Sequence, residues 1–371
     1  QAQLQTLTDA ARQMGRETAF SASEAAEGLN YLALAGYDAE QAATALPTIL
    51  RVAGAGAMDL ADASDMVTDS MSALGIAATQ ENLEGFGDKL AMTASKANTS
   101  VSQLGEAMIK VGGTAKGLKG GVTEASAALG VLADSGIKGA EGGTHLRNMI
   151  QSLQEGRNNS AKEIMANMGI SAYDDNGNMK SLGDTFAELN EHMAGNTAAQ
   201  NNGILSTIFK QTDLAAAKAM MAATANSVES LSTVMDASLV ESGQSLASLG
   251  INLQDMADNF DTATSSDAGV LFSGLQSLVG DGTTRFEELS AAIEDSKGAA
   301  EDMYNIQMDN LEGDVATLKS AFDDLKISIY EDTGGPLRGL TQMATQSINN
   351  INNAYQQGGA GAAAAQLGNE A

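Results

Sequence analysis

Apolar residues recur every three or four positions along most of the chain, a period that predicts amphipathic α-helices. Ser21-Ala-Ser-Glu24 has the spacing of a capping box, which predicts that a helix begins just after Ser21. Gly36 is expected to end that helix, and Asp38 is expected to cap the next one. Pro47 lies inside the second pattern, so we expect it to kink that helix or to restart it.

The same arrangement returns more loosely about 80 residues later, which indicates a loose internal repeat. Gly112-Gly113 is expected to break one helix, and the pattern of Thr123–Leu132 predicts the next. Towards the C-terminus, apolar spacing from Met303 to Ile329 predicts one long helical period that ends at Gly334-Gly-Pro336. Another helical pattern begins at Leu337.

One short segment has the composition of a β-turn. Asn176-Gly177 is a strong two-residue hairpin signal, and the flanking Ile170, Ala172 and Met179 are able to pair as a short ribbon. The predicted fold class is therefore mainly α, with short amphipathic helices joined by glycine-rich turns in helical hairpins or a bundle. At most one small β-hairpin is expected, near residues 170–180.

Changes in pattern divide the chain into four regions. Residues 1–156 are predicted to be a core region of helical hairpins, and residues 157–236 a second helical part of the core containing the Asn-Gly turn. Residues 237–355 form a C-terminal helical region, and residues 356–371 have the composition of a low-complexity linker. Because the first residue is Gln and no signal peptide follows, we interpret the sequence as an excerpt from a longer protein.

Composition limits the kind of core that these helices build. Of the 371 residues, 43% are apolar but only 4% are aromatic, and Trp is absent. Cores must therefore consist of small aliphatic residues and the 18 Met, which suit close helix packing. The 40 Gly and only 2 Pro favour many short helices over a few long ones.

Charge and hydropathy exclude several classes of function. With 47 acidic against 20 basic residues, the net charge of −27 argues against direct nucleic-acid binding, which needs clustered Lys and Arg. The absence of Cys excludes disulfides, thiolate nucleophiles and Cys-ligated metals. Weakly polar runs such as Ala268–Gly280 fall short of the roughly 20 residues of a spanning helix, so membrane contact is expected only through parts outside this excerpt.

The candidate metal ligands each have a simpler structural interpretation. His145 follows Glu141 by four residues, a spacing able to ligate a metal on a helix, but two glycines intervene and a structural role is favoured. His192 follows Glu188 by four residues, which predicts a surface pair. The turn beginning at Asp174 starts like a calcium loop but has Gly in the fourth position instead of the sixth.

The remaining polar clusters also lack the order that chemistry requires. The glycines between Gly112 and Gly121 have neither the P-loop spacing nor a preceding strand, so we interpret them as joints between helices. Acidic pairs such as Asp323-Asp324 and Glu287-Glu288 are explained by solvated helix faces. We therefore expect no catalytic, cofactor-binding or metal-binding residue.

Four segments in a fixed order resemble the core domain of phage tail tape measure proteins. They are Gly15-Arg-Glu-Thr-Ala-Phe-Ser-Ala-Ser-Glu24 with its continuation to Gly36, Gly136-Ile-Lys-Gly with Gly143-Thr-His-Leu-Arg147, Tyr173-Asp-Asp-Asn-Gly177, and Leu205-Ser-Thr-Ile-Phe209. The residues that carry the resemblance are Gly15, Phe20, Glu24, Gly36, Gly136, Gly143, Thr144, Leu146, Arg147, Tyr173, Asp174, Gly177 and Phe209. A weaker likeness runs from Leu311 to Pro336.

This resemblance implies a non-enzymatic structural protein of the phage virion or a prophage. Such a protein lies in the tail tube lumen, sets tail length during assembly in the host cytoplasm, and is ejected ahead of the genome. Its implied partners are the tail tube protein, tail assembly chaperones, distal tail or baseplate proteins, and further copies of itself. Two alternatives stay open: a peptidoglycan hydrolase that penetrates the cell wall, and a membrane-channel-forming segment of a tail protein.

Overall fold

The structure is a computed structural model that describes residues 2–225, 283–331, 346 and 349–359. Within these residues the chain is almost entirely helical, as predicted, and contains no strand. One isolated antiparallel bridge joins Tyr173 to Met179, at the position where a small hairpin was expected. The predicted fold class is therefore confirmed.

The helices of the first part follow one another with short connections. They are α1 (Ala2–Glu17), α2 (Ala22–Leu34), α3 (Ala39–Ala55), α4 (Leu60–Leu74), α5 (Gln80–Lys96), α6 (Val101–Val111), the 3-10 helix η1 (Gly112–Gly117), α7 (Gly121–Asp134) and α8 (Gly139–Glu155). The later helices are α9 (Asn159–Asn167), α10 (Leu182–Met193), α11 (Ala198–Ile208), the 3-10 helix η2 (Gln211–Asp213), α12 (Leu214–Thr224), α16 (Arg285–Glu294), α17 (Ala299–Met308) and α18 (Leu311–Glu331). Residues 349–359 are also helical.

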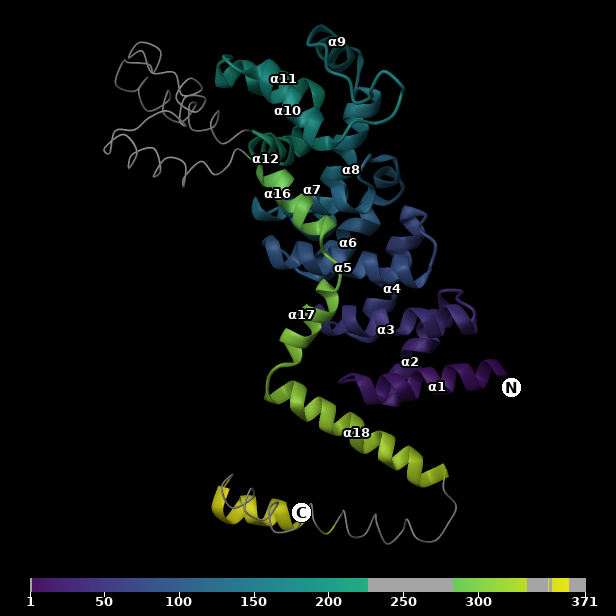
Figure 1. Ribbon diagram of the computed structural model, residues 1–371. Coiled ribbons are helices and arrows are strands. Elements are labelled where there is room, and N and C mark those ends of the chain that lie inside the picture. The colour runs from purple at the N-terminus through teal and green to yellow at the C-terminus, as the bar shows by residue number, and fades with distance from the viewer. Residues whose placement is uncertain (1, 226–282, 332–345, 347–348, 360–371) are drawn as a thin grey trace, which may run out of the picture.

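These helices are arranged as a pile that follows chain order (Figure 1). The pair α1 and α2 lies at one end, α3 to α8 follow, and α9 to α12 form the other end. Within the pile α6 packs on α8, and α1 packs on both α2 and α3. A continuous hydrophobic core, made mainly of Ala, Leu, Ile, Val and Met side chains, joins the layers.

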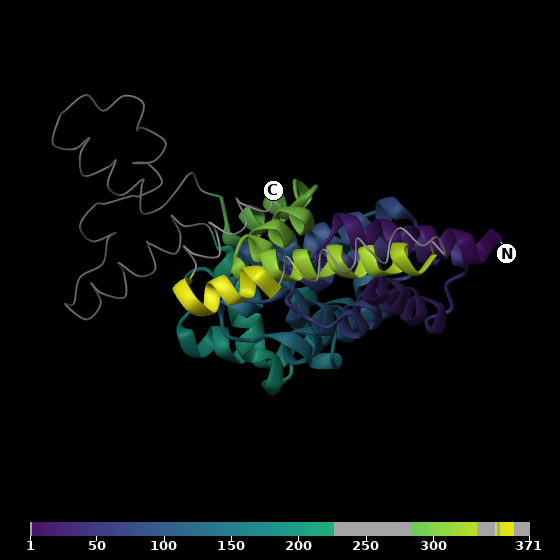
Figure 2. The ribbon, with the colours of Figure 1, turned by 90° about the horizontal axis from the view of Figure 1, so that it is seen from below.

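The segment containing α16, α17 and α18, residues 285–331, runs back along the pile from α12 to α1, and we call it the return segment (Figure 1). Helix α16 packs on α7 and α5, α17 packs on α5 and α3, and α18 lies against α1 and α2. Seen from below, α18 crosses the end of the pile beside α1 (Figure 2). Residues far apart in sequence therefore hold one another in place.

Two polar contacts hold α17 of the return segment in place. The buried carboxylate of Asp88 accepts hydrogen bonds from the backbone N–H groups of Gly298 at 2.8 Å and Ala300 at 3.0 Å, so it caps the N-terminus of α17. Farther along α17, the Tyr304 hydroxyl accepts a hydrogen bond from the Ala19 N–H at 2.6 Å. Both contacts supply acceptors to backbone groups that would otherwise lack them.

The predicted helix starts are confirmed in detail. Ser21 and Glu24 form a complete capping box at the start of α2, and Asp38 caps α3 through a second box with Gln41. The helix expected to end at Gly36 stops at Leu34, and Gly36 itself has φ of 93°. These features are local, so neighbouring residues suffice to specify them.

Helix α3 continues through Pro47, so of the two expected outcomes the restart is wrong and the kink stays a prediction. One prediction about helix boundaries is wrong. The long period from Met303 to Ile329 is two helices, because Asn310 accepts hydrogen bonds from the N–H groups of Glu312 at 2.9 Å and Gly313 at 3.0 Å and so starts α18 afresh.

Several predictions fall partly outside the described residues. The break at Gly334-Gly-Pro336, the helix start at Leu337 and residues 360–371 of the predicted linker all lie there. The first residues of that linker, 356–359, are helical. The division into four regions remains a prediction.

Among the described residues, no helix combines the length and apolar character needed to cross a membrane.

Candidate functional site

The joint between α1 and α2 places two of the motif residues, Gly15 and Phe20, around one close contact. A Cβ at Gly15 would lie 2.6 Å from the Ala22 backbone nitrogen, so only Gly permits this approach of α1 to α2. The buried Ser320 hydroxyl lies 2.5 Å from the Gly15 carbonyl oxygen and 2.9 Å from that of Phe20, and its single proton serves either acceptor. The motif segment that begins at Gly15 therefore also contacts α18.

Gly36 and Gly136 have the same function at the ends of α2 and α7. Their φ angles are 93° and 85°, in the left-handed region that favours glycine. In each case the following residue donates its N–H back into the helix, Tyr37 to Leu32 at 3.1 Å and Ile137 to Leu132 at 2.9 Å. Both glycines end a helix and turn the chain towards the next one.

The Gly143 motif lies inside α8 and mediates a helix–helix contact. A Cβ at Gly143 would lie 2.7 Å from the Ala107 Cα of α6, and Leu146 is buried in the core beside this contact. Thr144 donates its hydroxyl to the Ala140 carbonyl at 2.7 Å, and Arg147 lies 3.5 Å from the Lys110 carbonyl. Gly143 therefore sets how closely α6 and α8 pack, and Arg147 adds a contact between the same two helices.

The segment around Asp174 is a self-contained turn. The Asp174 carboxylate accepts hydrogen bonds from the N–H groups of Asn176 and Asn178, both at 2.9 Å, and Gly177 takes a φ of 79°. The Asn178 N–H, followed by that of Asn176, holds the pKa of Asp174 below its usual range. Tyr173 is exposed beside it.

Within the described residues no group of three or more His, Cys, Asp or Glu side chains has the arrangement of a metal site.

Phe209 belongs to the core at the α9–α12 end of the pile. Its ring stacks on Phe186 of α10 with 5.9 Å between centroids and 6° between planes, and both side chains are fully buried. The Arg157 guanidinium donates to the Phe209 carbonyl oxygen at 2.7 Å. The motif that ends at Phe209 therefore packs the end of α11 against α10 and bonds it to Arg157, just before α9.

His145 has a partner that sequence reasoning missed. Its Nδ1 lies 2.7 Å from Oδ1 of the buried Asp213, and Asn148 Nδ2 donates to the same oxygen at 3.2 Å. Glu141 lies on the other side of the ring, 3.6 Å from Nε2. The only sequence signal was the position of Asp213 just before the Ala-rich helix α12. The contact joins α8 to η2.

Glu188, expected to pair with His192, has Lys180 as its partner instead, with 2.6 Å between Oε1 and Nζ. The two residues lie on either side of the turn that leads into α10. The ion pair therefore holds the residue just before α10 against the middle of that helix.

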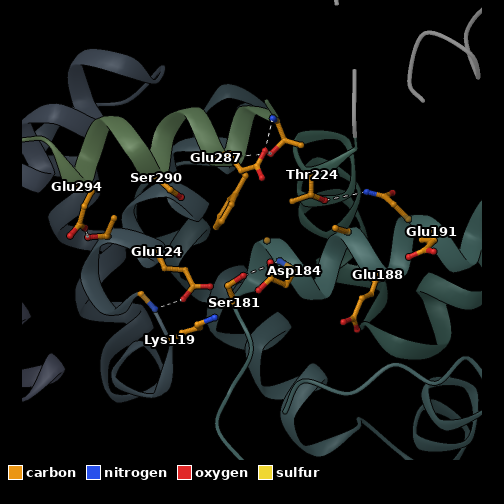
Figure 3. Close-up of a pocket in the computed structure, with 17 residues that line it drawn as sticks. Lys119, Glu124, Ser181, Asp184, Glu188, Glu191, Thr224, Glu287, Ser290 and Glu294 are labelled. Atoms are coloured by element: carbon orange, nitrogen blue, oxygen red, sulfur yellow. Dashed lines mark hydrogen bonds between the residues drawn. The ribbon is translucent and has the colours of Figure 1, made fainter. Parts of the chain in front are cut away.

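A cleft of about 1020 Å³ lies between α7, α10, α12 and α16 (Figure 3). Thr224 of α12 and Thr284 at the start of α16 both line it. Lys119 is the basic residue of its lining. The acidic residues of its lining are Glu124, Asp184, Glu188, Glu191, Glu287 and Glu294.

Glu124 is the most buried of these carboxylates. Its oxygens accept hydrogen bonds from the Gly120 N–H at 2.8 Å and from the Leu182 N–H, so it caps α7 and α10 together. Burial raises the pKa of Glu124, and the two N–H donors oppose that rise. A carboxyl group with a raised pKa resembles a general acid, yet here both oxygens have backbone partners.

Other carboxylates of the cleft are held in the same way. Glu294 accepts from the Thr123 hydroxyl at 2.8 Å and lies 3.6 Å from Lys89 Nζ, and these two partners, Thr123 first, lower its pKa. Glu287 completes a capping box with Thr284 at the start of α16. The carboxylates therefore stabilise helix ends and helix contacts around the cleft.

Comparison with known proteins identifies relatives of the whole layered pile. The model of a family described as phage-related minor tail protein matches residues 8–210. The chain is 29% identical over 318 residues to the tape measure protein of Pneumococcus phage Dp-1, covering 86% of this chain and 22% of that protein. It is 25% identical over 347 residues to the probable tape measure protein of Escherichia phage P2, covering 94% of this chain and 36% of that protein.

The chain thus spans about a fifth and about a third of the length of these two relatives. No solved structure matches it. The matched family segment, residues 8–210, begins within α1 and ends just after α11, so it contains all the motif residues described above.

Proposed function

The chain belongs to the phage-related minor tail protein family, and from this premise we propose that it forms the core of a tail tape measure protein. In this role it occupies the lumen of the tail tube, takes part in setting tail length during assembly in the host, and leaves the tail ahead of the DNA. The observation that carries the proposal is similarity to proteins named tape measure protein over 86% and 94% of this chain.

The fold favours a compact core over the extended helical part that sets tube length, which we call the ruler. A continuous helix advances about 1.5 Å per residue, which gives a linear relation between chain length and tube length. In this chain glycine turns such as Gly36 and Gly136 fold successive helices back into a pile, so each residue adds less to its length than it would in one continuous helix. We therefore assign the ruler to extended helical parts of the protein, beginning with the helix at 349–359.

The partners that this role requires are the tail tube protein, the assembly chaperones that cover the protein before the tube forms, and distal tail or baseplate proteins. The net charge of −27 favours protein partners over direct contact with DNA, because it repels phosphate.

We also propose that the protein acts without catalysis. Glu124, the carboxylate most like a general acid, has backbone donors on both oxygens, and Glu294 is occupied by Thr123 and Lys89. A zymogram with cell wall as substrate tests this proposal. No clearing is expected, and clearing that disappears in a Glu124→Gln variant would establish a hydrolase instead.

The ruler assignment is tested by two matched insertions in the full-length protein of the phage. A 28-residue helical segment placed after Asn353 should lengthen the tail by about 42 Å at 1.5 Å per residue. The same segment placed in the Gly195 turn between α10 and α11 should leave tail length unchanged. Electron microscopy of the tails measures both. Equal lengths in the two variants would contradict a ruler role for the region after Asn353.

A further inference from the structure

Four helices of the pile each present a glycine to the return segment. The glycines belong to α10, α7, α5 and α3, and the return segment meets them in that order as it runs back along the pile (Figure 1). Each glycine leaves a notch, because a Cβ in its place would contact or overlap a side chain of the return segment. The pairs are Gly183 with Phe286, Gly130 with Leu289, Gly87 with Ala300, and Gly54 with Tyr304. Together the four notches form a groove along the pile, which we call the glycine groove.

The fit of the return segment in the groove is close. A Cβ at Gly54 would overlap the Tyr304 ring, and the three atoms nearest to it all belong to that ring. A Cβ at Gly183 would lie 2.9 Å from the Phe286 ring. Both aromatic residues are buried by these contacts. A methyl group added at Gly54 therefore meets the return segment before it meets any atom of the pile.

Three partly exposed ion pairs join the return segment to the pile beside the groove. They are Arg285 with Asp134 at 3.0 Å, Glu294 with Lys89 at 3.6 Å, and Glu301 with Arg51 at 3.7 Å. Buried apolar contacts with a polar, partly exposed rim are the arrangement found where one protein binds another. The return segment therefore contacts the pile in the way that a bound peptide would.

The two helices in the groove depend on the pile for their structure. Helices α16 and α17 have 10 residues each, and isolated helices shorter than about 12–15 residues are marginal in water. Residues 295–298 are the whole connection between them, and the Asp88 carboxylate holds Gly298 at the end of that connection. Because the connection is short and shares this contact, release of one helix removes support from the other.

The pile has contacts of its own that do not involve these helices. Its pairs α6 with α8 and α1 with α2 pack directly on each other, and the family match at residues 8–210 ends before the return segment begins. We propose that α16 and α17, residues 285–308, form a strap that opens from the glycine groove as one unit while the pile stays folded. Because the notches lie on four helices of the pile, the closed strap restrains the spacing of these helices and the open strap releases it. This device belongs to the fold itself and does not depend on a role in setting tail length.

Hydrogen exchange of the full chain tests whether the strap opens as one unit. The slowest amides of each helix are compared, because helix ends fray by themselves. Gly54→Ala should speed exchange in α16 and α17 alike by about 5- to 150-fold, the change in opening equilibrium that matches the usual cost of overpacking. Gly85→Ala on α5 is the matched control and should not speed it, because a Cβ there meets nothing within 4 Å. Acceleration confined to α17 would overturn the proposal.

Gly143→Ala supplies the converse test, whether the pile stays folded when the strap opens. Its methyl group strains the contact of α8 with α6, and that contact is intact in both the closed and the open form of the strap. Exchange should therefore become faster in α6 and α8 and keep the parent rate in α16 and α17. Equal acceleration of strap and pile would show that they open only together, against the proposal.

A reversible disulfide tests the closed form, because the chain contains no Cys of its own. A Cβ at Gly87 would lie 3.9 Å from the Ala300 Cβ, a separation that suits a disulfide. Oxidised Gly87→Cys/Ala300→Cys should slow exchange in α16 as well as in α17, and reduction should reverse both effects. Gly85→Cys/Ala300→Cys is the matched control and should keep both thiols reactive towards an alkylating reagent. If α16 still exchanged at the parent rate in the crosslinked protein, the two helices would open independently and no strap would exist.

Discussion

Gly143 of α8 lies directly against Ala107 of α6, with no room between the two backbones for a side chain. A Cβ at Gly143 would come within 2.7 Å of the Ala107 Cα and closer still to its carbonyl oxygen. Backbone atoms cannot move aside as a flexible side chain can, so the contact excludes every residue except glycine. The pairing of α6 with α8 at the centre of the pile depends on this contact.

Gly143→Ala should therefore destabilise the protein by about 1–3 kcal/mol, the usual cost of overpacking a close contact. Gly85→Ala on α5 is the matched control, because a Cβ there meets nothing within 4 Å. That variant should be more stable by about 0.4–1 kcal/mol, since alanine reduces the entropy of the unfolded chain. Urea unfolding followed by circular dichroism measures both. Similar effects of the two substitutions would show that α6 and α8 are farther apart than described.

Asp88 should contribute to stability through the return segment. Asp88→Ala removes both acceptors at the start of α17 and should cost about 1–3 kcal/mol, because buried N–H groups are left without partners. Asp88→Asn keeps one acceptor oxygen and should cost less. Hydrogen exchange should become faster first in residues 298–308 of Asp88→Ala. Faster exchange only in α5, with α17 unchanged, would contradict the capping role.

The stack of Phe186 on Phe209 is suited to a double-mutant cycle. Each Phe→Ala substitution should cost about 3–5 kcal/mol, because both rings are fully buried. The double variant should cost less than the sum by about 0.5–1.5 kcal/mol, the coupling expected of an aromatic pair. Additive effects would mean that each ring contributes only through its burial.

The sequence predicts helix ends well and predicts long-range packing poorly. Ser21, Glu24 and Asp38 identify helix starts because each cap involves residues only two or three positions apart. The contact of Asp88 with Ala300 joins residues 212 positions apart, and apolar periodicity has no information on such pairs. The split between α17 and α18 was detectable, since the step from Ile306 to Leu311 breaks the helical spacing and Asn310 is a good cap.

The motif residues illustrate the same limit at the candidate site. Gly36 was expected to end a helix, and its positive φ angle agrees with that expectation; Gly136 takes the same conformation. Gly143 has a different reason for being glycine, because it lies inside a helix and faces another backbone. Asp213, the partner of His145, gave only the weak signal of its position before α12, since its place beside α8 depends on the fold of the intervening residues.

Asp174 provides a pH-dependent test of the turn after α9. The Asn178 and Asn176 N–H groups hold its pKa below the ordinary value of about 3.9, so the charged form stabilises the turn above that value and the effect is lost as pH falls through the folded pKa. Asp174→Ala should therefore increase amide exchange at Asn176 and Asn178 near neutral pH, with the difference from the parent protein shrinking in acid. Asp174→Asn keeps one acceptor without a titrating charge, so its own exchange protection at Asn176 and Asn178 should not change as pH passes through the pKa of Asp174. NMR titration of the Asp174 carboxyl carbon gives the pKa itself, and a midpoint at or above about 3.9 would show that these hydrogen bonds do not hold the turn.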